Sequence, residues 1–598
     1  MSSRVRRDAL TTSRAVLAVV VALFVSACSP QVAESDPVEQ SPAALQAHSE
    51  EFAQGIVEVT DRVWMAIGYG LANSILIEAD DGLIIIDTME TLAEGRRVAT
   101  EFRALSDKPL KALIYTHNHT DHVFGAEAFV QVLGAPDVPV EVFAHESTAA
   151  AVYRIVSEYR PIITARSLRM FGSALTDSEL VNNGIGPRLA IDEDSAFGFV
   201  APTRTVRDRL AVTVAGEPLE LVHAPGETDD QIFVWLPQRQ VLAVGDNLYK
   251  AFPNLYTIRG TPYRSLKDWA RSIDAMRALP VAYLVPSHSR PLQGAAEVQR
   301  VLTNYRDAIR YVYDQSVRWI NAGLTPNELV ERVQLPPHLA QEPYLAEFYG
   351  TVRWSARAVF AGNLGWFDGN PTTLDPLPPV ERAQRLATLA GGVAALQRQL
   401  REAVDADDNA WALELSDALL RLDPDDAAAR QLRVNVLRRL GERATNPNAR
   451  HYYLMSAREL GEGLRLRPVN SGTLEMLRAI PMDAIMDALA TNLQAEKTLD
   501  LQQKVELQFT DTDETWTLWL RRGVLEPVPR ALSEPDIVVA VDSLIWKQML
   551  GRQISPVVAI ARHMDFRVGS SIGLTRFLLL FDPLREAPEP APLATVGL

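Results

Sequence analysis

The chain contains a single cysteine, so it cannot form an intrachain disulfide. Its 598 residues include 59 lysines and arginines against 75 aspartates and glutamates, which gives a net charge of −16 at pH 7. A nucleic-acid-binding surface needs clustered lysine and arginine, so this balance argues against a nucleic-acid partner. It leaves room for a small anionic substrate, which needs only a local positive site.

Long apolar runs are also missing, except at the N-terminus. Residues 1–28 combine arginines at positions 4, 6, 7 and 14, an apolar stretch at Ala15–Val25 and small residues directly before Cys28. This order is typical of a secretory signal. Because it ends in cysteine, it resembles a bacterial lipoprotein signal, in which Cys28 is acylated and becomes the mature N-terminus. The alternative is an ordinary signal peptide or an uncleaved anchor.

The localisation follows from this signal. We expect the protein on the periplasmic face of a bacterial membrane as a lipoprotein, or secreted or periplasmic if Cys28 carries no lipid. Beyond the signal, no segment approaches the ~18 apolar residues of a membrane span. The polar residues 29–50 are expected to form a flexible tether.

The rest of the chain divides into three regions by its apolar pattern. From 51 to 303, short apolar runs alternate with helical patterns, which predicts an α/β domain. From 304 to 466, apolar residues recur with helical periodicity, and a Pro–Asp break separates two of the helices. From 467 to 584, alternation at Val505, Leu507 and Phe509 predicts a β-hairpin within a small α/β domain. The proline-rich residues 585–598 are expected to be disordered.

The sequence THNHTDHVFGA at 116–126 places three of the ten histidines within six residues. Residues two apart on a strand share a face, so His117 and His119 can point together while Asp121 and His122 turn to a second point. Imidazole nitrogens and carboxylate oxygens bind Zn²⁺ at about 2 Å. Four ligands are too many for one catalytic ion that keeps a position open, and they suit two ions.

The pattern H-x-H-x-D-H is the signature of the metallo-β-lactamase superfamily, and three later loops extend the resemblance. They are APGETDD at 224–230, AVGDN at 243–247 and VPSHSRP at 285–291. The resemblance implies an αββα sandwich with two zinc ions. It assigns one ion to His117, His119 and Glu227, the other to Asp121, His122 and His288, and shares Asp246 between them. The alternative for Glu227 is a carboxylate behind the ligands, with Asp229 or Asp230 nearby.

Three further segments resemble the alkyl sulfatases within this superfamily. NLYTIRG at 254–260 resembles the stretch in which an arginine holds the sulfate, which implies that role for Arg259. GNLGWFDGNPTTLDPLPP at 362–379 resembles the dimerisation domain of that family. DIVVAVD and FRVGSSIGLTRFLLLFD resemble its sterol-carrier-like C-terminal domain. The resemblance therefore implies a homodimer with a catalytic, a helical and a small α/β domain.

Other substrate contacts are expected around Arg259. The glycine-rich NNGIGPRL at 182–189 resembles a loop whose backbone N–H faces the sulfate, which gives Gly184 and Gly186 as candidates. Tyr256 and Arg357 are further candidates. Two positions depart from the family pattern, because Phe171 stands where a sulfate-contacting tyrosine is expected and Asp246 where glutamate is frequent. These departures leave the substrate range open.

The predicted function is hydrolysis of alkyl sulfate esters such as dodecyl sulfate, to the alcohol and inorganic sulfate, by water activated at two zinc ions. Asp121 and Arg259 are the predicted catalytic residues. The alternative is another hydrolase of the same fold, acting on a phosphoester, lactone or thioester. A lipid-binding lipoprotein without catalysis is a third class, and the complete ligand set argues against it.

Overall fold

The computed structural model describes residues 42–466 and 473–582. The predicted signal with Cys28, the first part of the predicted tether and the predicted disordered tail at 585–598 lie outside these residues. Within the described ranges, no helix has the length and apolar character needed to cross a membrane.

The end of the predicted tether is not a free linker in the structure. It forms α2 (Pro42–His48) and the 3₁₀ helix η1 (Ser49–Phe52). Leu45 is buried in an apolar cluster with Leu71 and Tyr249, and the His48 ring lies 4.7 Å from the ring of Phe348. The prediction of a flexible tether was therefore wrong for residues 42–50. The few apolar residues of this polar segment are too short a pattern for a helix to be predicted from the sequence.

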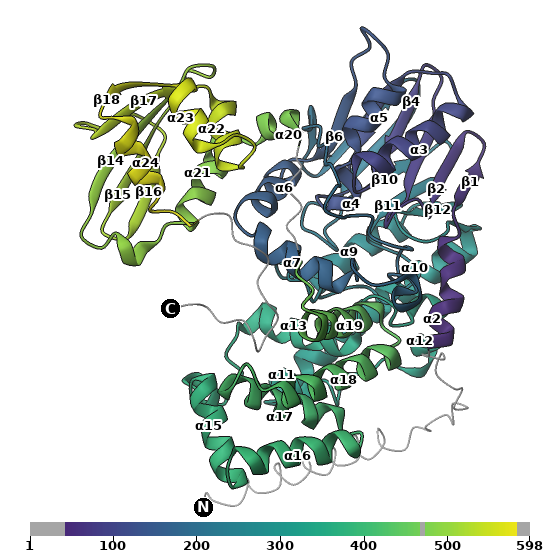
Figure 1. The fold of residues 1–598 in the computed structure, drawn as a ribbon. Coiled ribbons are helices and arrows are strands. Elements are labelled where there is room, and N and C mark those ends of the chain that lie inside the picture. The colour runs from purple at the N-terminus through teal and green to yellow at the C-terminus, as the bar shows by residue number, and fades with distance from the viewer. Residues whose placement is uncertain (1–41, 467–472, 583–598) are drawn as a thin grey trace, which may run out of the picture. The chain divides into compact units, whose positions relative to one another are not determined.

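Two facing sheets form the centre of the N-terminal region (Figure 1). The first sheet has its strands in sequence order: β1 (Gly55–Thr60), β2 (Val63–Ile67), β3 (Ser74–Glu78), β4 (Leu83–Ile86), β5 (Leu110–Ile114), β6 (Glu141–His145) and β7 (Arg204–Val206). The second has the order β13 (Leu292–Gln293), β12 (Tyr283–Pro286), β11 (Val241–Gly245), β10 (Ile232–Leu236), β9 (Glu217–His223) and β8 (Arg209–Val214). Pairing is parallel from β4 to β7 and between β11 and β12, and antiparallel elsewhere.

The central strands are apolar on both faces because each sheet is covered on both sides. Every residue of β4, β10 and β11 is buried. One apolar cluster fills the space between the sheets, and a second lies between the first sheet and helices α3 (Leu92–Leu105) and α5 (Ala126–Leu133). A third lies under α9 (Leu266–Arg277) and α10 (Ala295–Asn321). The predicted αββα sandwich is confirmed.

Four short helices join the strands of the first sheet near their C-terminal ends. They are α4 (Thr120–Val123), α6 (Thr148–Ser157), α7 (Arg160–Met170) and α8 (Asp177–Leu180). Helix α4 carries the second half of the histidine motif, and α6 and α7 contribute to the cavity described below.

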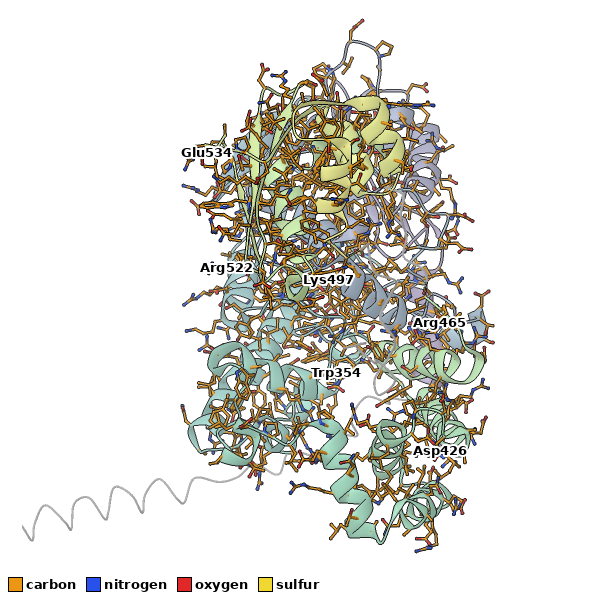
Figure 2. The ribbon with its side chains drawn as sticks, turned by 60° about the vertical axis from the view of Figure 1, so that its left-hand side comes forward. Trp354, Asp426, Arg465, Lys497, Arg522 and Glu534 are labelled. Carbon is orange, nitrogen blue, oxygen red and sulfur yellow. The ribbon has the colours of Figure 1, made fainter. Side chains whose placement is uncertain are left out.

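The predicted helical region is confirmed, although α10 begins at Ala295 and so crosses the predicted boundary at 303/304. It continues with α11 (Pro326–Leu329), α12 (Pro337–Ala340), η2 (Pro343–Leu345), α13 (Val352–Leu364), α14 (Pro371–Leu374), α15 (Pro379–Ala390), α16 (Val393–Asp405), α17 (Asn409–Leu422), α18 (Ala427–Arg443) and α19 (Pro447–Glu462). The Pro–Asp break separates α17 from α18. Asp426, labelled in Figure 2, caps α18 by accepting hydrogen bonds from the N–H groups of Ala428 and Ala429, both at 3.0 Å.

The last region is a small α/β domain, as predicted. Its five-stranded sheet has the order β16 (Val524–Val528), β15 (Thr515–Arg521), β14 (Gln502–Phe509), β17 (Ile537–Val541) and β18 (Met564–Val568). Its helices are α20 (Leu474–Ala479), α21 (Met482–Thr491), η3 (Ala495–Lys497), α22 (Ser543–Leu550), α23 (Pro556–His563) and α24 (Ser571–Leu578). Strands β14 and β15 form the predicted hairpin, with Leu507 opposite Trp516.

Candidate metal centre

Loops at the strand ends bring the predicted ligands together. His117 and His119 follow β5, Asp121 and His122 lie in α4, Asp246 follows β11 and His288 follows β12. They form two groups, within each of which the ligand atoms lie within 4.8 Å of one another: His117, His119 and Asp246, and Asp121, His122 and His288. The chain thus places two sets of nitrogen and oxygen donors side by side.

Asp246 lies between the two groups. One of its carboxylate oxygens is 3.7 Å from His117 Nε2 and 3.2 Å from His288 Nε2. The other is 3.6 Å from His122 Nε2. A single carboxylate therefore reaches histidines of both groups, which is the placement that a ligand shared by two ions requires.

Three of the histidines turn the same ring nitrogen toward the centre. His122 donates from Nδ1 to Asp87 Oδ2 at 2.7 Å, and His288 donates from Nδ1 to the Leu71 carbonyl at 2.9 Å. His117 Nδ1 lies 3.1 Å from Thr116 Oγ1, whose own hydrogen goes to Asp87. Since each Nδ1 carries its hydrogen outward, each Nε2 is the nitrogen that faces the centre, as in histidines that bind metals.

Asp87 is a residue of this centre that the sequence interpretation missed. It is fully buried and accepts hydrogen bonds from the Thr116 N–H and hydroxyl, both at 2.9 Å, and from Ser287 Oγ at 2.6 Å, in addition to that from His122. It therefore ties the ends of β4, β5 and β12 together and fixes the His122 ring. Its signal in the sequence was only its position at the end of the apolar strand GLIIID.

The charges around the centre favour a bound cation. Burial alone would lower the pKa of His122, but the carboxylates of Asp246, Asp87 and Asp121 outweigh it and hold that pKa well above its ordinary value. His117 shows the opposite balance, because burial and then the neighbouring His122 lower its pKa well below the usual range. The second group thus has an excess of negative charge that a cation would neutralise.

Several buried donor atoms of the centre have no hydrogen-bond partner among the described residues, which also favours a bound metal. His122 Nε2, Asp246 Oδ1 and Glu227 Oε2 are buried and have no hydrogen-bond partner in the described part of the chain. Buried polar atoms are normally paired, and a cluster of unpaired nitrogen and oxygen atoms is the donor chemistry that divalent zinc takes.

Glu227 is close to the centre but lies outside both groups of donors. It is buried, and its Oε1 accepts a hydrogen bond from Arg264 Nη1 at 2.7 Å. Burial raises the pKa of Glu227 to about 7 even though Arg264 lowers it. Its role as a ligand stays a prediction.

Asp230, weighed as the alternative to Glu227, supports the histidine loop instead. Its carboxylate accepts hydrogen bonds from Asn118 Nδ2 at 2.5 Å and from Thr148 Oγ1 at 2.7 Å. Asn118 stands between His117 and His119, so Asp230 holds the loop from behind. Asp229 is exposed.

Arg259 reaches the metal centre from NLYTIRG, as the sulfate-binding role requires. Its Nη2 donates to His119 Nε2 at 2.9 Å. Together with His119, Asp121 and Asp246 it lines a cavity of about 640 Å³, which is within the usual range for small-molecule sites.

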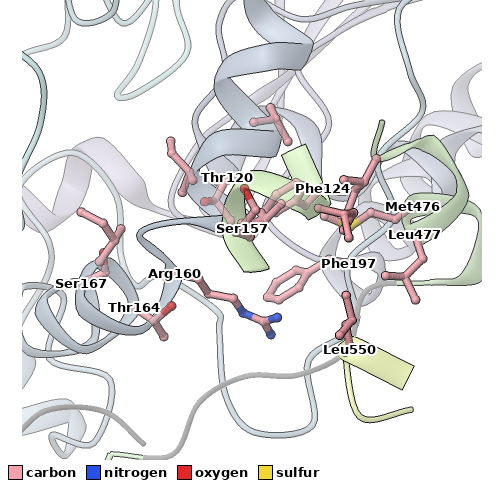
Figure 3. A pocket seen from close by; sticks show the side chains of 18 of the residues that line it. Thr120, Phe124, Ser157, Arg160, Thr164, Ser167, Phe197, Met476, Leu477 and Leu550 are labelled. Atoms are coloured by element: carbon pink, nitrogen blue, oxygen red, sulfur yellow. The ribbon is translucent and has the colours of Figure 1, made fainter. Parts of the chain in front are cut away.

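Most of this cavity is apolar. Phe124, Phe197, Met476, Leu477 and Leu550 surround it (Figure 3), and Phe171 also lines it. Charged residues such as Arg160 and Lys547 also line it, but apolar side chains predominate, and they suit an aliphatic chain.

Four predicted substrate contacts do not line this cavity: Gly184, Gly186, Tyr256 and Arg357. The Gly184 N–H donates to Asn182 Oδ1 at 2.8 Å, and so is already used. Arg357 donates from Nε to Asn327 Oδ1 at 3.1 Å. A Cβ at Gly186 would lie 2.2 Å from the Leu71 carbonyl oxygen, so this glycine permits close packing behind His288. The glycine-rich loop thus supports the centre from behind.

Comparison with known protein families divides the chain into three parts. Residues 67–288 match the metallo-beta-lactamase superfamily, residues 325–463 match the alkyl sulfatase dimerisation family, and residues 470–587 match the alkyl sulfatase C-terminal family. These ranges follow the αββα sandwich, the helical region and the small α/β domain.

Two relatives match over nearly the whole chain. A linear primary-alkylsulfatase of Pseudomonas sp. (strain ATCC 19151) is 42% identical over 530 residues, which cover 86% of this chain and 99% of that protein. An (R)-specific secondary-alkylsulfatase of Pseudomonas sp. is 31% identical over 542 residues, covering 88% of this chain and 81% of that protein. The structure of the stereoselective inverting sec-alkylsulfatase Pisa1 from Pseudomonas sp. superimposes with a TM-score of 0.84 at 28% identity, over 92% of this chain and 88% of that one.

Proposed function

The chain belongs to the alkylsulfatase family of the metallo-β-lactamase superfamily, and from this we propose that it hydrolyses alkyl sulfate esters to the alcohol and inorganic sulfate. One observation carries the proposal: Arg259 and residues of both donor groups line one largely apolar cavity. That arrangement suits an anionic headgroup attached to an aliphatic tail.

Two zinc ions are the cofactors that we propose. His117, His119 and Asp246 would hold one ion and Asp121, His122 and His288 the other, with Asp246 between them and Glu227 as a further ligand of the first. Bound zinc lowers the pKa of water and polarises the oxygens of a bound ester. The identity and number of the ions rest on the donor chemistry and on the family.

The protein's own residues orient and shield the substrate. The planar guanidinium of Arg259 can donate two parallel hydrogen bonds to a sulfate while it contacts His119. Phe124, Phe171 and Phe197 exclude water around the tail, which strengthens the interaction of Arg259 with the headgroup. Asp230 and Asp87 keep the ligand loops in place by the hydrogen bonds described above.

A panel of esters tests this function. The zinc-loaded protein is expected to release inorganic sulfate from dodecyl sulfate and to leave nitrocefin and a phosphodiester unchanged, because its cavity joins Arg259 at the donor groups to a largely apolar wall. Removal of metal with a chelator should abolish the sulfate release, and added zinc should restore it. Turnover of the phosphodiester or of a lactone in preference to dodecyl sulfate would favour the alternative hydrolase.

A homodimer through the helical region is also proposed. Several large apolar side chains there are exposed, among them Leu389 at 85% and Trp366 at 74%. Such a concentration is unusual for a free surface and typical of an interface. The match to an alkyl sulfatase dimerisation family supports the same arrangement.

Light scattering at micromolar concentration is therefore expected to give twice the chain mass. Leu389→Glu together with Trp366→Glu should shift the mass toward the monomer, since both put charge into the interface, whereas Val524→Glu, an exposed apolar residue of the C-terminal domain, should not. A monomeric parent protein would refute the proposal.

Anchoring through Cys28 remains a proposal from the sequence. Expressed in a bacterium with its N-terminal segment, the protein is expected in the membrane fraction, and Cys28→Ser should move it to the soluble periplasmic fraction. An unchanged distribution of the Cys28→Ser protein would contradict lipidation.

A further inference from the structure

Glu90 is a fully buried carboxylate that lies near the metal centre without belonging to either donor group. It stands in the loop between β4 and α3, three residues after Asp87. Burial raises its pKa to about 7, and the negative charge of Asp121 contributes to the rise. Burying a carboxyl group is unfavourable unless hydrogen bonds compensate for the lost hydration, so the partners of Glu90 indicate why it is buried.

Both hydrogen bonds that Glu90 accepts from other parts of the chain end on the same oxygen. Oε1 accepts from the Leu71 N–H at 3.0 Å and from the Ala190 N–H at 2.9 Å. Gly70 allows this approach, because a Cβ there would lie 2.3 Å from Glu90 Oε2. One carboxylate oxygen thus links two backbone segments that are more than a hundred residues apart in sequence.

Each of the linked segments has a second task. The Leu71 carbonyl accepts the Nδ1 hydrogen of His288 at 2.9 Å, and the Ile185 carbonyl lies 3.1 Å from the same nitrogen. Leu71, Ile185 and Leu189 also line the cavity. The link made by Glu90 therefore holds Leu71, whose carbonyl orients a predicted metal ligand, and the segment before Ala190, which forms part of the cavity wall.

We propose that Glu90 is a positioning residue for the reaction, acting through hydrogen-bond geometry: it fixes Leu71 against Ala190 and so fixes the His288 ring. The proposal rests on the function proposed above. Oε2 has no hydrogen-bond partner among the residues described, so Oε1 alone makes both bonds. The role therefore needs one acceptor atom at the position of Oε1. Glutamine supplies that acceptor without the charge. Aspartate keeps the charge, but its side chain is one methylene shorter and cannot reach both N–H groups.

The test compares Glu90→Gln with Glu90→Asp. The two ions are loaded as Co²⁺, the visible absorption bands and the binding affinities are measured by titration, and kcat and KM for dodecyl sulfate are determined with zinc. Glu90→Gln is expected to keep both affinities, the parent bands and kcat/KM within about three-fold. Glu90→Asp is expected to bind one of the two ions about 10–100-fold more weakly, as losses behind a ligand typically do, with altered bands and a lower kcat.

Glu217→Ala is the matched control. Glu217, at the start of β9, is also a buried carboxylate, but it forms an ion pair with Arg239. Its loss should therefore lower stability and leave the Co²⁺ absorption bands unchanged. An impaired Glu90→Gln protein, or a Glu90→Asp protein with the parent affinities and bands, would overturn the proposal. The metal titration does not depend on which ester is hydrolysed. The proposal about Glu90 can therefore fail while the proposed function stands, and the proposed function can fail while the proposal about Glu90 stands.

Discussion

His119→Ala is expected to lose metal and activity together, with kcat/KM for dodecyl sulfate reduced at least about 10³-fold. His119 contributes a ring nitrogen to the first donor group and contacts Arg259 through the other, so its loss weakens both the metal site and the headgroup site. A single preorganised donor at a reacting centre is commonly worth 10²–10³-fold in kcat. A residue that supports a bound ion as well is expected to exceed that range.

The measurement is metal content by elemental analysis beside steady-state kinetics. The parent should carry two ions per chain and the His119→Ala protein about one. His223→Ala is the control, since His223 lies at the end of strand β9, donates from Nε2 to the Asp229 carbonyl at 2.7 Å and belongs to neither donor group. A parent enzyme that is active with one ion or none would refute the two-ion assignment.

The ligands could be found in the sequence because the fold puts them at strand ends. A buried strand such as β5 reads as an apolar run, and polar residues that follow it mark the edge of the sheet where loops meet. The spacing of His117, His119, Asp121 and His122 then carries its own chemistry. Asp246 and His288 each follow an apolar strand in the same way. The family pattern was needed only to distinguish them from other polar residues at strand ends.

The supporting residues could not be found in this way. Asp87 and Glu90 act through hydrogen bonds to residues far away in sequence, such as Ser287 and Ala190, and no local pattern records such a pairing. Gly184 is a different case, because its N–H is taken by Asn182 through a local hydrogen bond that the glycine-rich motif does not reveal. Motifs thus predicted the donor groups that the structure brings together, while the residues that orient them depend on the packing of loops.

Arg259→Lys is expected to lower kcat/KM for dodecyl sulfate, because it removes about 2–4 kcal/mol of transition-state stabilisation, the range for losing a charged and well-placed donor. This corresponds to roughly 30- to 900-fold. Lysine keeps the positive charge but not the planar fork, so it cannot contact His119 and donate two parallel hydrogen bonds to a sulfate at once. Metal content should stay at the parent level, because Arg259 is not a metal ligand.

Arg357→Lys provides the matched control. Arg357 does not line the cavity and donates to Asn327, so its replacement should leave kcat/KM within about two-fold, the effect of a surface substitution. If Arg259→Lys and Arg357→Lys were equally active, the headgroup would have to be held by another cation, and Arg160, which also lines the cavity, would be the next candidate. A fall in activity confined to Arg259→Lys, at full metal occupancy, would locate the sulfate between Arg259 and the two donor groups.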